Sequence, residues 1–360
     1  MISKNLFVHK WAPRVLKLVM VSSIILSSFS CSDDDEDLLG NWVRLGSFEG
    51  YPRSGAVAVS LNGKAYVTTG YDDDDIDDDN IYRLKDMWEF NPESESWKKM
   101  KGMPDEAYPR DQAVGFAASG KVYIGTGIGE YKEGVTTRNP WLNDFWGFDP
   151  GANSWTRIAD FPGTARYGAI AFSIKDKGYV CSGYDGGYLK DLWEYNPSTD
   201  EWSPKASFPG EKRRDAVVFV INDIAYVCTG IDNNQGRKDF YSYDPTTDKW
   251  TKLRDISDTS DESYDDDYNI VRSSAVAFTV DGKGYVCTAS LGSVGSTVWE
   301  YDPGSDLWDE KTSFEGSSRN EAVAFTINNI GYITTGRSSG TYFDDLWRFE
   351  PNAEQDDNDN

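Results

Sequence analysis

Short runs of apolar and aromatic residues, separated by turn residues, recur along the chain, and one stretch shows the pattern in full. It begins at Arg166, turns at Asp176 and continues through a second run around Tyr179. A loop then leads to a third run that contains Trp193, and a tight turn leads to Trp202. Apolar and aromatic runs bounded by turn residues are typical of β-strands. The stretch therefore predicts a unit of four strands.

Six copies of this unit follow one another along the chain. Each copy begins its first strand with an arginine that stands three residues before an alanine. Each second strand contains a tyrosine followed by valine or isoleucine, and each third strand has an aromatic residue four residues before a proline. In five copies a fourth strand starts at a tryptophan: Trp97, Trp155, Trp202, Trp250 and Trp308. Self-similarity with a period of about 45–60 residues indicates a solenoid or a propeller, and four strands per unit are typical of a propeller blade.

The sixth copy has no fourth strand after Pro351, and a matching strand stands at the other end of the repeats. It is the segment 41–45, with the sequence NWVRL. We expect this segment to complete the last blade, because closure removes exposed strand edges and ties the two ends together. The predicted fold class is all-β: a six-bladed propeller over residues 41–352, closed by an N-terminal strand. Residues 353–360 are predicted to be a disordered acidic tail.

The repeat resembles that of the kelch β-propellers. In that family a strand ends in a pair of glycines, and an aromatic residue, an Asp/Asn-Pro turn and a spaced tryptophan follow. The resemblance covers residues 41–352 and implies a six-bladed kelch-type propeller. The chain departs from the kelch pattern at the glycine pair, where Thr or Ser takes the first place in five blades. Blade five reads Thr288-Ala289 and lacks both glycines, so we expect its local backbone to differ.

The segment before the repeats predicts export. Residues 1–17 carry lysine and arginine but no acid, and the apolar run at 18–30 is shorter than the roughly 20 residues that span a bilayer. We therefore expect residues 1–30 to be a signal peptide. Cys31 and the acidic run after it resemble a bacterial lipoprotein signal, which implies lipidation at Cys31 and a lipidated acidic tether at 31–40. This implies an outer-membrane lipoprotein exposed at the cell surface; an ordinary secreted protein is the alternative.

Composition excludes several classes of function. The formal net charge of −24 argues against a nucleic-acid partner, which needs a basic surface. The single histidine, His9, lies in the predicted signal peptide, so Ser-His-Asp catalysis and His-ligated zinc are not expected. Galactose oxidase has a kelch-type domain, but its copper chemistry uses histidines that the mature chain lacks. We predict no cofactor, and membrane contact through the lipid anchor only. Cys181, Cys228 and Cys287 occupy equivalent repeat positions and are predicted to be small buried packing residues.

Loop lengths predict which face of the propeller is functional. The turns between first and second strands have two residues, such as Asn62-Gly63, and are typical of hairpins. The turns between third and fourth strands are also short. Because strands in a blade alternate in direction, these turns share one face, and the longer second-to-third and blade-to-blade connections share the other. Functional residues generally lie in such loops on a rigid scaffold, so we expect the ligand there.

Six arginines at the starts of the first strands are expected to surround the mouth of the central channel: Arg53, Arg110, Arg166, Arg213, Arg272 and Arg319. Guanidinium groups bind carboxylates through two hydrogen bonds, so this set predicts an acidic ligand such as a uronate, a sialate or an acidic peptide. The alternative is structural, because five blades carry an aspartate just before the third strand: Asp86, Asp144, Asp191, Asp239 and Asp345. In blade five Thr297 replaces the aspartate, while Arg272 remains.

Aromatic residues in the long loops are a second candidate ligand surface, foremost Trp141, Tyr131 and Tyr184. Rings with a polar edge suit both sugar stacking and protein interfaces. The alternative is that they pack the loops onto the disc. Aspartate-rich segments at 72–79 and 261–267 offer oxygen ligands for calcium. Charge runs are more often solvated, so no metal site is predicted.

Three functions remain open. The first hypothesis is a non-catalytic binding or scaffolding propeller, tethered to the envelope, whose long-loop face binds a glycan or protein ligand. The second is an enzyme acting on an acidic sugar, since some kelch propellers are sialic-acid epimerases or mutarotases and carboxyl groups can serve as general acid and base. The third is a purely structural surface protein. The sequence nominates no catalytic residue, and the absence of the Asp-box of sialidase propellers disfavours a hydrolase.

Overall fold

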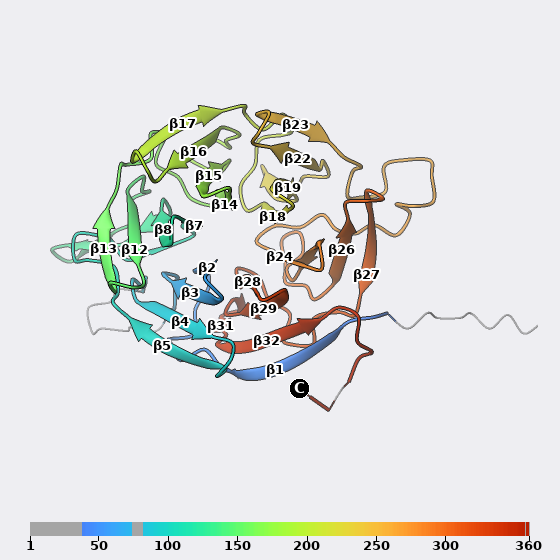
Figure 1. The fold of residues 1–360 in the computed structure, drawn as a ribbon, viewed down its shortest axis with the longest axis horizontal. Coiled ribbons are helices and arrows are strands. Elements are labelled where there is room, and N and C mark those ends of the chain that lie inside the picture. The colour runs from blue at the N-terminus through green and yellow to red at the C-terminus, as the bar shows by residue number, and fades with distance from the viewer. Residues whose placement is uncertain (1–37, 74–81, 357, 360) are drawn as a thin grey trace, which may run out of the picture. The chain divides into compact units, whose positions relative to one another are not determined.

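Tight two-residue turns join the first and second strands of every blade. A computed structural model of the chain describes residues 38–73, 82–356 and 358–359, and its strands confirm the predicted repeat (Figure 1). Both residues of each turn have positive φ, for example 52° at Asn62 and 74° at Gly63. This is the type I′ geometry, whose twist matches that of two paired strands. Asn, Asp and Gly adopt it readily, so these turns fix the register of each hairpin.

The described residues form six four-stranded antiparallel blades. Blade one comprises β2 (Val57–Leu61), β3 (Lys64–Thr68), β4 (Met87–Asn91) and β5 (Ser96–Met100). Blade two comprises β7 (Val114–Ala118), β8 (Lys121–Gly125), β12 (Phe145–Asp149) and β13 (Ser154–Arg157). Blade three comprises β14 (Ile170–Ile174), β15 (Lys177–Cys181), β16 (Leu192–Asn196) and β17 (Glu201–Lys205).

The remaining blades follow the same order around the disc. Blade four comprises β18 (Val217–Ile221), β19 (Ile224–Cys228), β22 (Tyr241–Asp244) and β23 (Lys249–Lys252). Blade five comprises β24 (Val276–Val280), β25 (Lys283–Cys287), β26 (Val298–Asp302) and β27 (Leu307–Lys311). Blade six comprises β28 (Val323–Ile327), β29 (Ile330–Thr334), β32 (Asp345–Glu350) and, from the other end of the chain, β1 (Asn41–Ser47).

Strand β1 closes the propeller, as predicted. It lies on the outer side of β32 (Figure 1), with Trp42 opposite Phe349 and Arg44 opposite Trp347. The Trp42 side chain is fully buried, and its ring centroid lies 4.4 Å from that of Phe349 and 4.9 Å from that of Phe314. Apolar burial of an aromatic ring is a large favourable contribution. Blade six is thus built from both ends of the repeat region.

The C-terminal segment differs from the expected disordered tail in the residues that the structure describes. The Gly40 amide donates to the Ala353 carbonyl (2.9 Å), and the Asp356 amide donates to Oδ1 of Asn41 (2.8 Å). The Asn41 side-chain amide donates in turn to Asp359 (2.8 Å). These bonds hold the segment against the start of β1. The predicted signal peptide, Cys31 and most of the tether lie outside the described residues.

Apolar side chains of one blade pack directly on the next blade. In blade two Phe116 stacks on Tyr123, with ring centroids 5.2 Å apart. A Cβ placed on Gly178 of blade three would lie about 2.0 Å from the Phe116 ring, so this position has room only for glycine. Cys181, Cys228 and Cys287 are fully buried free thiols, which confirms their predicted packing role.

Backbone hydrogen bonds join each blade to the next near the channel. The glycine after each second strand donates its N–H to the carbonyl of the following blade's repeat arginine, as Gly336 of blade six does to Arg53 (2.7 Å). Blade five keeps this bond through Ala289, which donates to Arg319 at 2.8 Å. We expected the local backbone of blade five to differ, and the difference is in φ. This angle is 53° at Ala289 and 85–110° at the equivalent glycines of the other five blades. The bond survives because alanine reaches the left-handed region without a large change.

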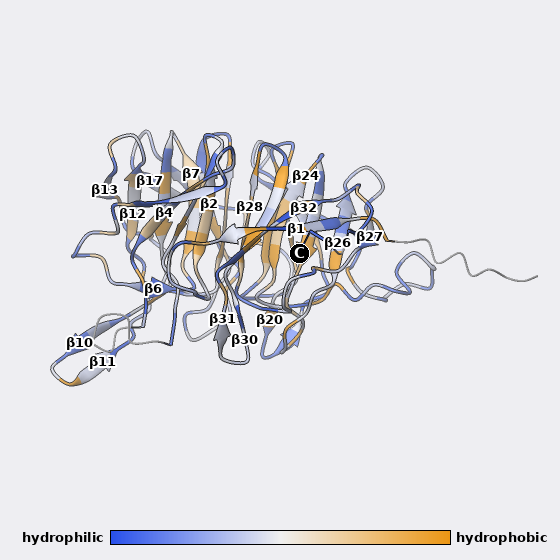
Figure 2. Cartoon of the chain, turned by 90° about the horizontal axis from the view of Figure 1, so that it is seen from below, coloured by the Kyte–Doolittle hydropathy of each residue, from blue (hydrophilic) through white to orange (hydrophobic). Residues whose placement is uncertain are grey.

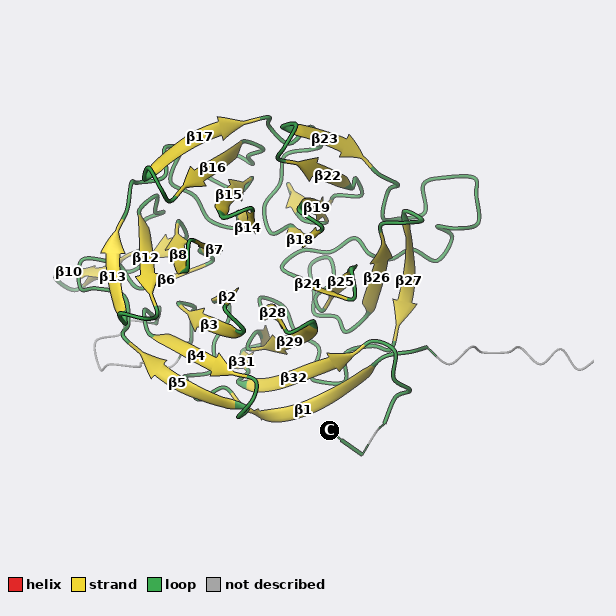
Figure 3. Cartoon of the chain, in the orientation of Figure 1, coloured by secondary structure: helices red, strands yellow, loops and turns green. Residues whose placement is uncertain are grey.

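The two faces of the disc differ as predicted. Short paired strands lie on one face (Figure 2). They are β6 (Arg110–Asp111), β9 (Ile128–Gly129), β10 (Tyr131–Glu133), β11 (Thr136–Arg138), β20 (Ile231–Asp232), β21 (Gln235–Gly236), β30 (Arg337–Ser338) and β31 (Thr341–Tyr342). The first strands enclose a channel of about 190 Å³ lined largely by alanine and valine, including Ala56, Ala113 and Ala169. Strands and loops make up the whole described region (Figure 3), and it has no helix able to cross a membrane.

Candidate functional site at the channel mouth

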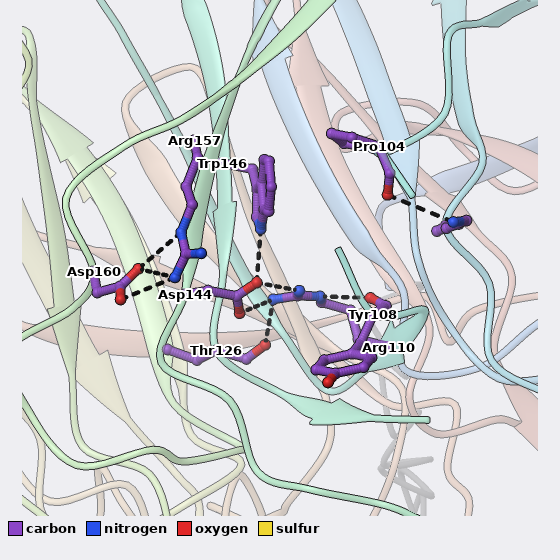
Figure 4. Close-up of polar contacts among 9 residues, drawn as sticks. Pro104, Tyr108, Arg110, Thr126, Asp144, Trp146, Arg157 and Asp160 are labelled. Atoms are coloured by element: carbon purple, nitrogen blue, oxygen red, sulfur yellow. Dashed lines mark hydrogen bonds and ion pairs between the residues drawn. The ribbon is translucent and has the colours of Figure 1, made fainter. Parts of the chain in front are cut away.

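The six repeat arginines are buried inside the blades. Arg110 is representative (Figure 4): its guanidinium binds both oxygens of Asp144, at 2.8 and 2.7 Å. The same group donates to the carbonyls of Tyr108 (3.1 Å) and Thr126 (3.2 Å). The indole N–H of Trp146 donates to the same aspartate at 2.6 Å. Four of the five N–H groups of the Arg110 guanidinium therefore have a partner within the repeat unit.

The other aspartate-bearing blades repeat the ion pair, and blades one, three and six also repeat its two hydrogen bonds. The ion pairs are Arg53 with Asp86, Arg166 with Asp191, Arg213 with Asp239 and Arg319 with Asp345. Burial alone would raise the pKa of Asp86, Asp144 and Asp345, but the adjacent guanidinium outweighs burial and lowers the pKa of each carboxyl below its usual value. These carboxylates stay charged, so the pairs persist at neutral pH.

The structure thus favours the structural alternative for the arginine set. Each of the six side chains is at most 2% exposed, so none presents its guanidinium to a ligand over the channel mouth. The expected arginine-lined bowl made of Arg53, Arg110, Arg166, Arg213, Arg272 and Arg319 is not formed. In each blade the guanidinium instead joins the loop before the first strand to the end of the second strand through hydrogen bonds to their carbonyls. We do not retain these residues as ligand contacts at the channel mouth.

The residues that do reach the channel mouth lie one and two positions after each repeat arginine. The second of these positions is held in a closed circle of backbone hydrogen bonds, with N···O distances of 2.8–3.3 Å. Its members are Gly55, Gln112, Gly168, Asp215, Ser274 and Glu321. All six have φ between 50° and 61°. This shared backbone conformation brings side chains from different blades together around one axis.

Three carboxylates and three arginines gather there, which we call the channel-mouth cluster: Asp111, Asp215, Glu321, Arg83, Arg214 and Arg337. Arg83 donates to Asp111 at 2.7 Å, Arg337 pairs with Glu321 at 3.0 Å, and Arg214 pairs with Asp215. The arginine side chains are 12–41% exposed, in contrast to the repeat arginines. The cluster therefore offers charged groups to a ligand in the long-loop face.

Two carboxyl groups of the cluster have pKa values above those of an ordinary aspartate. Burial raises the pKa of Asp215 to about 6; Arg214 opposes this shift and the charge of Glu321 adds to it. Burial also raises the pKa of Asp111, again with an opposing arginine, Arg83, and a contribution from Glu321. A carboxyl group with a pKa near 6, such as that of Asp215, in a polar and partly open site is typical of acid–base chemistry.

An aromatic patch adjoins the cluster and contains two of the predicted ligand residues. Trp141 is 39% exposed, and its ring centroid lies 5.6 Å from that of Tyr167 and 5.8 Å from that of Tyr184. The Arg214 guanidinium lies 5.6 Å from the Tyr167 ring, which links the patch to the cluster. Tyr131 lies elsewhere, on the β10 strand, where it stacks on Tyr108 with centroids 5.2 Å apart. The patch and cluster form a continuous candidate site.

Acidic residues in the blade four to five connection form a separate group. Oxygens of Asp258, Asp265 and Asp266 lie within 4.8 Å of one another. Asp265 is fully buried and accepts hydrogen bonds from the amides of Thr259 and Ser260, both at 3.0 Å. Its carboxylate thus shapes its own loop, and we assign no ion to it. Most of the 72–79 segment lies outside the described residues.

Two family models match parts of the chain. The Kelch motif matches residues 52–104, and the KLHDC2/KLHL20/DRC7 Kelch-repeats domain matches residues 142–265. Together with the six blades of the described region, these matches decide the architecture. The chain is a kelch-type β-propeller.

Several curated relatives of this propeller carry the name N-acetylneuraminate epimerase. The chain is 28% identical over 164 residues to N-acetylneuraminate epimerase of Pasteurella multocida, and this match covers 38% of the chain and 41% of the relative. It is 29% identical over 115 residues to N-acetylneuraminate epimerase of Escherichia coli O157:H7, covering 30% of each. The chain thus aligns with about two fifths or less of these relatives' length. The solved structure of YjhT superposes with a TM-score of 0.67 at 18% identity, covering 84% of this chain and 95% of that one, which supports the fold.

The channel-mouth cluster was missed in the sequence for an identifiable reason. Its acids occupy the two variable positions of the Arg-x-x-Ala pattern, which differ from blade to blade. Periodicity selects residues that every blade needs, and these proved to be structural. The signal that could have found the cluster is a departure from the repeat. Asp111, Asp215 and Glu321 are charged residues at repeat positions where other blades have glycine or another side chain.

Proposed function

We propose that the protein binds a carboxylated sugar of the sialic-acid type at the channel mouth and interconverts its two anomers. The observation that carries this proposal is the meeting of Asp215 and Glu321 with partly exposed arginines beside the aromatic patch. The relatives named N-acetylneuraminate epimerase support this substrate class.

Anomer interconversion requires a proton donor and a proton acceptor. A base takes the proton of the anomeric hydroxyl, the bond between the anomeric carbon and the ring oxygen breaks, and an acid protonates that oxygen. Reclosure on the other face of the carbonyl reverses these steps. With a pKa of about 6, Asp215 is protonated in a minor fraction of molecules at neutral pH and suits either role. Glu321 supplies a second carboxyl group in the same cluster.

The arginines of the cluster and the aromatic patch orient the substrate in this proposal. An arginine has five N–H donors, so Arg214 and Arg337 can each bind an acidic neighbour and a substrate carboxylate together. The exposed face of Trp141 offers a stacking surface for the apolar side of a sugar ring. Both contacts would place the anomeric centre over Asp215.

The decisive measurement is the rate of anomer exchange of N-acetylneuraminate, followed by NMR with and without the purified propeller. We expect the wild type to accelerate exchange and Asp215→Asn to reduce the acceleration by about 10²–10⁴-fold, the usual contribution of a general acid or base. Asp223→Asn is the matched control, since Asp223 lies in an exposed hairpin turn. Exchange at the uncatalysed rate with wild-type protein would reject the catalytic proposal.

A binding function without turnover is the second candidate, favoured by the exposure of Trp141 next to Tyr184. On this proposal the patch binds a glycan or a protein ligand. Titration calorimetry with N-acetylneuraminate and with neutral sugars separates the two functions. Saturable binding that Trp141→Ala weakens, with anomer exchange at the uncatalysed rate, would support a binding protein.

We further propose that the propeller is exported and held in the outer membrane, exposed at the cell surface, by lipid on Cys31. The support is the sequence around Cys31, which lies outside the described residues. Cys31→Ala should move the protein from the membrane fraction to the soluble fraction, while Ser32→Ala should leave it in the membrane fraction. Retention of the Cys31→Ala protein in membranes would contradict the lipid anchor.

A further inference from the structure

Blade five contains a buried arginine that lacks the carboxylate found in its sister blades. Arg272 is 2% exposed, and the position of the paired aspartate is occupied by Thr297. Its N–H groups donate to the carbonyls of Ile270 (3.0 Å), Thr288 (3.2 Å) and Thr297 (3.0 Å), all neutral acceptors. Within the described ranges no carboxylate forms an ion pair with Arg272.

The second terminal nitrogen of the Arg272 guanidinium marks where the missing carboxylate would lie. The second terminal nitrogen of Arg272 donates to the Thr297 hydroxyl at 3.0 Å and to the Asn269 carbonyl at 3.4 Å. In the other blades the equivalent nitrogen binds an aspartate oxygen, for example at 2.7 Å in the pair of Arg110 with Asp144. A buried cation without a counter-ion is unfavourable. Burial accordingly lowers the pKa of Arg272.

The indole that elsewhere shares the aspartate has also changed its partner. Trp299 stands where Trp146 stands in blade two, but its N–H donates to the side-chain oxygen of Asn269 at 3.0 Å. In four other blades the tryptophan donates to the blade's own aspartate. Blade five has therefore kept the guanidinium and the indole that donate to the aspartate in its sister blades, but it lacks the aspartate that accepts from them.

A cavity of about 460 Å³ opens beside this position. Its lining includes Arg272, Asn269, Ser290, Ser296, Thr297 and Ser318. Hydroxyl and amide groups thus surround the guanidinium, and Ser290, Ser296 and Thr297 are half-buried, so the cavity is open to the surface. None of these residues belongs to the channel-mouth cluster or the aromatic patch.

We propose that this cavity binds a small organic carboxylate, which takes the place of the absent aspartate side chain. The carboxylate accepts two hydrogen bonds from Arg272, the geometry that four sister blades build with their own aspartate. It displaces one bond of each terminal nitrogen, those to the carbonyls of Thr297 and Asn269, while the serine and threonine hydroxyls bind the rest of the molecule. The volume exceeds the needs of a single inorganic ion, which favours an organic ligand.

Thermal unfolding with acetate as the probe tests this site, at constant ionic strength against chloride. A ligand that binds the folded state alone raises Tm in a saturable way. We expect such a rise for the wild type and for Thr297→Ser, which keeps the hydroxyl and the neutral charge. Thr297→Asp restores the sister-blade carboxylate, so it should melt at a higher temperature than the wild type and lose the acetate response.

Three outcomes would overturn the proposal. They are an acetate response in Thr297→Asp equal to that of the wild type, the absence of a wild-type response, and an equal response to chloride. Anomer exchange measured on Thr297→Asp keeps this site separate from the channel mouth. Exchange should stay at the wild-type rate, whatever the acetate response shows.

Discussion

At the scale of single residues, the ion pairs inside the blades and those on the surface have different consequences. Arg110 and Asp144 are 0% and 15% exposed, whereas Arg157 and Asp160, a few residues away, are 56% and 47% exposed (Figure 4). Solvent screens the surface pair, so it adds little to stability. The buried pair is different because removal of one partner leaves a charge in an apolar setting.

Asp144→Asn should therefore lower the free energy of unfolding by about 3–5 kcal/mol, the usual cost of breaking a buried pair. Its side chain keeps its size but leaves Arg110 without a counter-ion. Urea unfolding measures the change. Asp160→Asn is the matched control and should cost less than about 1 kcal/mol. Equal effects of the two substitutions would show that the repeat arginines do not depend on their aspartates.

At the scale of elements, β1 contributes to blade six through the Trp42 side chain as well as through its backbone hydrogen bonds. Trp42 fills the space between Phe314 of the blade five to six connection and Phe349 of β32. Trp42→Ala should destabilise the fold by about 3–5 kcal/mol, as expected for a buried aromatic side chain replaced by alanine. Trp141→Ala removes an exposed indole and should change stability by less than about 1 kcal/mol. Thermal unfolding compares the two variants.

The elements could be predicted from the sequence, and the site could not, for related physical reasons. Each blade uses the same hairpin turn and similar buried aromatic residues, and five blades use the same ion pair, so these features recur at a fixed spacing. A ligand site at the axis of the disc takes different side chains from different blades, such as Asp215 and Glu321. Their proximity depends on the circle of backbone bonds, which no local pattern reports. Trp141 was found because it breaks the pattern.

At the scale of the whole molecule, lowering the pH acts on two sets of carboxyl groups with opposite signs. Asp86, Asp144 and Asp345 have lowered pKa values in the folded state, so their contribution is present above their unfolded pKa and is lost as the pH falls below it. Asp215 has a raised pKa of about 6, so the folded state binds its proton more tightly than the unfolded chain does. Stability due to Asp215 therefore rises as the pH falls from 7 toward 4.

Between pH 7 and pH 5 this group should add roughly 1 kcal/mol to the free energy of unfolding, since a pKa difference of one unit corresponds to about 1.4 kcal/mol. Asp215→Asn carries no titrating proton, so its stability should rise less over the same interval, and the difference between the two proteins isolates the group. Urea unfolding at several pH values gives both curves. Below about pH 4 both should fall together as the buried Asp–Arg pairs are protonated. Parallel curves between pH 7 and 5 would mean that Asp215 titrates as an ordinary aspartate, which would also remove the basis for its role as an acid or base near neutral pH.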